Sequence, residues 1–154
     1  MRHVGLLLLR LIVGGIFVVH GYPKVLGGAG KVDRLPPTLR RHLGPGFDAA
    51  MERGGIANFR GNVERTGVPL PGMMAWAAAL AEFAGGALLI LGWLTRPAAL
   101  MLCGNMLVAI TRVHWKGGLV GQSGYEFALA LLGALVALLL GGPGALSIDG
   151  DRDD

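Results

Sequence analysis

The chain has 154 residues, of which 53% are hydrophobic and only 16% are charged, and its mean hydropathy is +0.56. Soluble domains carry about a quarter charged residues, so this composition excludes an ordinary soluble domain and indicates a membrane protein. The single cysteine, Cys103, allows neither an internal disulfide nor a dithiol redox pair. We expect lipid, and not nucleic acid, to surround this chain.

Four apolar segments follow one another along the chain, and each is near the length that a membrane-spanning helix requires. They cover residues 4–22, 73–94, 97–113 and 125–142. Because the bilayer core holds no water to hydrogen-bond the backbone, each segment should be helical throughout. The prediction is therefore an all-α membrane protein, a single domain over residues 1–154 built as a bundle of four transmembrane helices.

A long connection, residues 23–72, separates the first two predicted spans and holds eight of the fourteen lysine and arginine residues. It is too long for a simple loop, so we expect short interfacial helices at residues 47–52 and 55–65. An acidic tail, residues 143–154, ends the chain. Ten basic residues lie in the connection and the last interhelical loop against three on the other side, and the positive-inside rule therefore predicts a cytoplasmic connection.

An arginine lies inside the first apolar segment. Counted at about 100° per residue, Arg10 shares one narrow face with Gly14, Phe17, Gly21 and Lys24. Glycines allow helices to approach closely, so this face is predicted to be a seam between helices.

The predicted partner of Arg10 is a carboxylate in the second span, Glu82. At a rise of about 1.5 Å per residue, the two differ in depth by only ~7 Å, which two long side chains can bridge. Asn105, midway along the third span, would complete an intramembrane polar network. Two interpretations remain open, a structural pair that sets helix register and a proton relay or ligand site. We favour the structural one, because arginine stays protonated at any accessible pH.

A second polar group is expected at the membrane edge where the first span ends. Its members are His20, Tyr22, Lys24, His114, Trp115, Tyr125 and Glu126. In most membrane proteins, aromatic rings and cations are enriched at the level of the lipid head groups. The simpler interpretation is that these residues follow this general preference. The alternative is that they hydrogen-bond and protonate a quinone or contact a lipid head group. No metal site is expected, since the histidines have no ligand spacing.

The chain resembles the DoxX family of small four-helix bacterial membrane proteins over nearly its whole length. The resemblance is carried by "LRLIVGGIFVVHGYPKVLG", by "GVPLPGMMAWAAALAEFAGGALLILGWLTRPAAL" and by "GYEFALALLGALVALLLGGPGALSID". It implies a four-span bundle associated with membrane redox systems, such as subunits of quinol oxidases or of thiosulfate:quinone oxidoreductases. The first connection is longer than is usual for the family, and the resemblance assigns no role to the loop "VHWKGGLVGQSGYE".

Together, residues and resemblance predict an accessory or scaffolding subunit of a quinone-linked membrane redox or respiratory complex, located in the bacterial inner membrane. The alternative is a quinone- or quinol-binding oxidoreductase component that uses the polar group at the membrane edge. We expect no redox centre held by this chain, because it lacks paired haem ligands, iron–sulfur cysteines and a flavin fingerprint. A quinone or a lipid is the expected ligand, and other membrane subunits are the expected partners.

Overall fold

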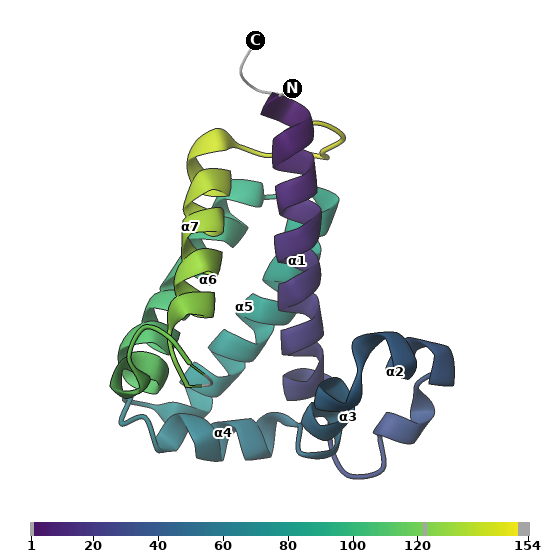
Figure 1. Ribbon diagram of the computed structural model, residues 1–154, viewed down its shortest axis with the longest axis vertical. Helices are drawn as coiled ribbons and strands as arrows, with labels where there is room; N and C mark the ends of the chain where they lie inside the picture. The colour runs from purple at the N-terminus through teal and green to yellow at the C-terminus, as the bar shows by residue number, and fades with distance from the viewer. Residues whose placement is uncertain (1, 122, 151–154) are drawn as a thin grey trace. The chain divides into compact units, whose positions relative to one another are not determined.

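A computed structural model describes residues 2–121 and 123–150, and within those residues every regular element is helical (Figure 1). The α-helices are α1 (Arg2–Leu26), α2 (Pro37–Leu43), α3 (Pro45–Glu52), α4 (Ile56–Glu64), α5 (Pro71–Leu91), α6 (Thr95–Val108) and α7 (Glu126–Gly141). Three short elements of 3-10 or π type accompany them: η1 (Val32–Arg34), η2 (Ala109–His114) and η3 (Trp115–Gly117). The all-α prediction is confirmed.

Three helical stretches are long and apolar enough to cross a membrane. They are Arg2–Leu26, Pro71–Leu91 and Thr95–Gly117, and they overlap the first three predicted spans. The fourth predicted span corresponds to α7, which has 16 residues. At 1.5 Å per residue such a helix measures about 24 Å, less than the roughly 30 Å of a hydrocarbon core. A fourth crossing therefore stays a prediction.

The described chain divides into two compact units. The first, here called the helical unit, contains the residues up to Val18 and those from Ala84 onward. The second, the connecting unit, is Val19–Phe83. Helices α1 and α5 each contribute to both units.

The helical unit is held together by apolar packing and by close contact of glycines. Its core includes Phe17, Leu89 and Leu102, and α6 packs against α7. A Cβ added to Gly14 would lie 2.7 Å from the carbonyl oxygen of Gly86, so α1 and α5 touch backbone to backbone there. The predicted glycine seam of the first span is thus confirmed at Gly14.

The segment after α7 folds back onto the helical unit and is held there by Arg10. The Nη1 atom of this buried arginine donates to the carbonyl oxygen of Pro143 at 2.7 Å, and Nη2 donates to that of Leu146 at 2.8 Å. Asp149 then accepts hydrogen bonds from the backbone N–H groups of Leu94 and Thr95, both at 2.8 Å. A carboxylate at the start of α6 satisfies donors that a helix N-terminus leaves open.

The described part of the predicted acidic tail, residues 143–150, therefore makes defined contacts with the helical unit. Its segment up to residue 150 carries the carbonyls that Arg10 binds and the carboxylate that caps α6. Residues 151–154 lie outside the described residues.

The connecting unit has a small core of its own, made by Val32, Phe47 and Met51. Arg40 in α2 binds Asp48 in α3 at 3.0 Å and Asp33 in η1 at 3.1 Å. The hydrogen bonds to Asp48, more than any other cause, raise the pKa of Arg40 above its ordinary value, so this guanidinium stays charged.

The two short helices predicted in the connection are confirmed as α3 and α4, whereas α2 and η1 were not predicted. Helix α2 has only 7 residues, and its two large apolar side chains, Leu39 and Leu43, are too few for a periodic pattern to indicate a helix. The location of these helices at the membrane interface stays a prediction.

We expect Gly92→Ala to destabilise the protein by roughly 1 to 3 kcal/mol. Gly92 has φ +63°, and a Cβ there would lie 2.6 Å from the Cβ of Ser147 and crowd the Arg10 guanidinium. The control is Gly104→Ala in α6, where a Cβ meets nothing within 4 Å. Thermal unfolding in detergent should show a lower midpoint for the first variant only. Equal midpoints would contradict the packing described around Arg10.

Candidate functional site

A partly buried ion pair joins the end of α1 to α5 within the connecting unit. Nζ of Lys24 binds Oε2 of Glu82, and only 7% of the Glu82 side chain is exposed. The same Nζ lies 4.6 Å from the centroid of the Phe59 ring in α4. A carboxylate withdrawn from water requires such a partner, because an unpaired buried charge is strongly unfavourable.

The structure gives the two predicted partners, Arg10 and Glu82, different neighbours from those expected. Arg10 binds carbonyl oxygens of the segment after α7, and Glu82 binds Lys24. The predicted pairing rested on the depths of the two residues along their helices. Depth alone could not predict that a segment more than 130 residues away in the sequence folds back and binds Arg10. Asn105 lies half-buried in α6, and its place in a polar network with Glu82 stays a prediction.

A cavity of about 470 Å³ opens beside Lys24 in the connecting unit. Its lining comes from the ends of α1 and α2, from α3 and the turn after it, and from α4. It includes His20, Lys24, Phe47, Arg53, Phe59 and Asn62. The cavity therefore combines nitrogen donors with aromatic and aliphatic surface, a composition typical of ligand sites.

The sequence predicted two of these lining residues, His20 and Lys24, but missed Phe47, Arg53, Phe59 and Asn62. The missed residues lie in the long connection, where no motif indicates a site. The signal that could have pointed there is the concentration of basic residues in residues 23–72.

Tyr22 has a structural position. Its ring packs at 6.3 Å from that of Phe47 and edge-on at 5.9 Å from that of Phe83, measured between centroids. Aromatic pairs at such distances stabilise packing beyond the area that they bury. The described contacts of Tyr22 are thus with neighbouring rings, and its predicted role as a ligand contact is untested.

The other four predicted edge residues lie together in the helical unit, around the turn that leads into α7. The rings of Trp115 and Tyr125 stack at 5.6 Å with an angle of 12° between their planes. Nδ1 of His114 lies 3.3 Å from the carbonyl oxygen of Ser123, and Glu126 accepts a long hydrogen bond, 3.5 Å, from the N–H of Gly121. These contacts close the loop. That the two groups of edge residues contact one ligand stays a prediction.

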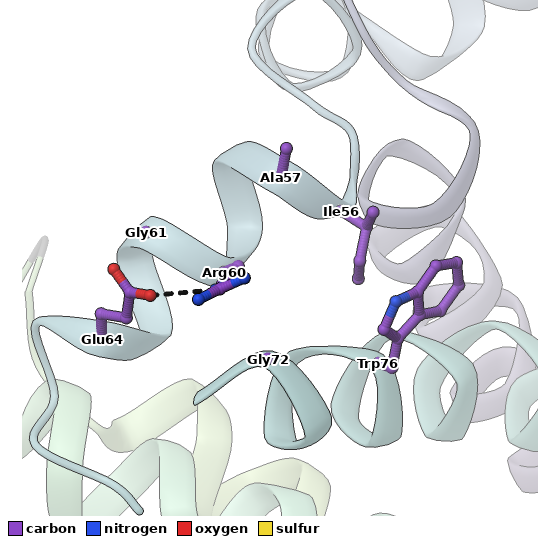
Figure 2. Close-up of a pocket in the computed structure, with 7 residues that line it drawn as sticks. All are labelled: Ile56, Ala57, Arg60, Gly61, Glu64, Gly72 and Trp76. Atoms are coloured by element: carbon purple, nitrogen blue, oxygen red, sulfur yellow. Dashed lines mark hydrogen bonds and ion pairs between the residues drawn. The ribbon is translucent and has the colours of Figure 1, made fainter. Parts of the chain in front are cut away.

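A second cavity, of about 540 Å³, lies between α4 and the start of α5 (Figure 2). Figure 2 shows Trp76 of α5 at one end and the pair of Arg60 and Glu64 at the other. That pair spans one helical turn at 3.0 Å, and both side chains are about half exposed. The positive charge of Arg60 is already balanced by Glu64. This cavity therefore attracts an anionic ligand less strongly than the cavity beside Lys24.

Within residues 2–121 and 123–150, no three histidine, cysteine or acidic side chains come close enough together to hold a metal ion. Cys103 is a buried, unbridged thiol in the core of the helical unit.

Comparison with known proteins points to one family. The family model named DoxX matches residues 5–115. Inner membrane protein YphA of Escherichia coli is 28% identical over 154 residues, which cover 96% of this chain and 90% of the relative. A protein of Bacillus subtilis named "putative oxidoreductase CatD" is 28% identical over 88% of this chain and 78% of its own length. An uncharacterized membrane protein of Mycobacterium tuberculosis is 30% identical over 92% of this chain and 77% of its own length. No solved structure matches the chain.

We expect Glu82→Gln to destabilise the protein by roughly 1 to 3 kcal/mol, because it leaves the Lys24 ammonium without its counter-charge. The control, Glu64→Gln, breaks an exposed pair within α4 and should cost less than about 0.5 kcal/mol. Thermal midpoints in detergent measure both effects. Midpoints that fall equally would mean that the Glu82 carboxylate needs no partner.

A double-mutant cycle then identifies the partner. Lys24→Met with Glu82→Gln should cost less than the sum of the two single changes, whereas Arg10→Met with Glu82→Gln should be additive. Coupling in the second cycle and additivity in the first would instead favour the pairing of Arg10 with Glu82 predicted from sequence.

Proposed function

Because this chain belongs to the DoxX family of membrane proteins, we propose that it is an accessory subunit of a quinone-linked redox complex in the bacterial inner membrane. The location is supported by two relatives named inner membrane proteins and by three helices able to span a bilayer. The redox association is supported by the relative from Bacillus subtilis, whose name includes the word oxidoreductase.

The observation that carries the scaffold role is the large unburied surface of the long helices. Only 28%, 39% and 33% of the residues in the apolar windows of the three candidate spans are buried inside the chain. Lipid can cover such surface, but so can helices of other subunits. Gly104 in α6 and Gly133 in α7 have open space where a Cβ would lie, so a partner backbone can approach closely at both. Gly85 differs, because Met101 and Leu102 of this chain already pack on it.

A second candidate function is that the chain contacts a quinone or quinol directly. The observation that favours it is the cavity beside Lys24, where His20 and Asn62 offer hydrogen-bonding groups next to the Phe47 and Phe59 rings. A quinone needs donors for its carbonyl oxygens and an apolar surface for its ring. Electrons would then have to reach the quinone from a partner subunit.

We further propose that α7 is a fourth crossing and that both termini face the side opposite the connection. A helix shorter than the bilayer is accommodated by local thinning or by snorkelling side chains. A reporter active only in the periplasm should then be active when fused after residue 150 and inactive when inserted at the exposed Gly67. The reverse pattern would overturn the orientation, and activity of both or of neither would overturn the fourth crossing.

Co-purification tests the scaffold role. Gentle solubilisation of native membranes and capture of this chain should recover haem- or flavin-bearing proteins in a fixed ratio. Gly104→Leu should reduce that recovery several-fold, because it fills a docking surface, whereas Gly5→Leu near the start of α1 should not.

Recovery of the chain alone would contradict the accessory role. If the lone protein oxidises quinol and loses that activity with His20→Ala, the second candidate function is the correct one. A lone protein without activity would contradict both.

A further inference from the structure

The cavity beside Lys24 has a charge and a composition that suit one chemical class of ligand. We propose that it binds a phosphate group, supplied by the head group of an anionic phospholipid. This inference does not depend on the accessory role, because a lipid site would exist with or without partner subunits.

Charge is the first observation. The lining includes His20, Lys24 and Arg53, and it includes no aspartate or glutamate. The charge of Lys24 is balanced by Glu82, so Arg53 supplies the cationic charge for a ligand. Nε of Arg53 donates to the carbonyl oxygen of Ala49 at 3.2 Å, which orients the guanidinium and leaves its Nη atoms for phosphate oxygens.

The surrounding segment strengthens this attraction. Residues 23–72 contain eight lysines and arginines and four acidic residues, an excess of four positive charges that equals the net charge of the whole chain. Basic segments next to a membrane span attract anionic lipids through the negative potential of the membrane surface.

The apolar part of the lining favours a lipid over a soluble anion. Val19, Leu43, Phe47 and Phe59 line the same cavity and would contact the glycerol and the first methylene groups of an acyl chain. Lys24 lies in the last turn of α1, a helix of 25 residues that is long enough to span a bilayer. The end of such a helix lies at head-group level, where lipid phosphates are found.

Glycine at position 46 allows the cavity to be filled without changing its charge. Gly46 lines the cavity in the first turn of α3, and a Cβ there meets nothing within 4 Å. Gly46→Phe should therefore fold and occupy the ligand space. Gly61→Phe is the matched control, since Gly61 is equally open but lines the second cavity. Arg53→Gln and Arg65→Gln form a second pair, each removing one positive charge from the connecting unit.

The measurement is the number of lipids that each variant retains, counted by native mass spectrometry after equilibration in micelles that contain phosphatidylglycerol and phosphatidylcholine. The unaltered chain should retain phosphatidylglycerol preferentially. Arg53→Gln should weaken this retention at least about fivefold, the equivalent of one charge contact. Gly46→Phe should abolish it, and both control variants should stay within about twofold of the unaltered chain.

Inorganic phosphate distinguishes the two sources of the ligand. If millimolar phosphate displaces phosphatidylglycerol and binds the lipid-free protein in an Arg53-dependent way, the site binds phosphate from solution as well. Retention that is unchanged by Gly46→Phe and Arg53→Gln, or that falls equally in the controls, would overturn the proposal. Thermal midpoints show whether each variant is folded. Arg53→Gln changes an exposed residue. It therefore tests the proposal even if Gly46→Phe unfolds the chain.

Discussion

A guanidinium inside an apolar helix must be satisfied by protein groups, because the hydrocarbon around it supplies none. The Nη atoms of Arg10 meet this requirement with the carbonyl oxygens of Pro143 and Leu146. Those bonds hold the segment after α7 in place, and the same segment brings Asp149 to the start of α6. One buried cation in α1 thus positions the C-terminal segment, which in turn completes the N-terminus of another helix. Glycine at position 92 is part of this arrangement, because a side chain there would occupy the space of the guanidinium.

The connecting unit follows a similar rule with the opposite charge. Glu82 is almost fully buried and is balanced by Lys24, whose position in the last turn of α1 places it beside α4 and Phe59. Because this ion pair fixes the position of the Lys24 side chain, it also fixes the part of the cavity that Lys24 lines. The remaining positive charge of that wall comes from Arg53, in a part of the chain that is hydrophilic enough to lie outside the bilayer core.

These two arrangements bear differently on function. The Arg10 arrangement is structural, because every described bond of its guanidinium goes to backbone of the same unit. The cavity beside Lys24 is open, and its lining combines basic side chains with aromatic rings. Binding of a lipid there and docking of partner helices on α6 and α7 would use different residues, because the cavity and those glycines lie on different elements.

The sequence by itself determined the all-α class, three membrane-length helices, the short helices of the connection around residues 47–52 and 55–65, and the family. Hydrophobic run length and local periodicity carry that information, since a bilayer accepts almost no alternative to a helix. The tertiary structure alone decided which group satisfies Arg10, which cation pairs with Glu82, and that Arg53 and Phe59 share a cavity with His20. Sequence spacing along a helix gives depth and face, but not the path of a returning segment or of a 50-residue connection. The partners of the two buried charges depend on those paths, and for that reason local patterns could not identify them.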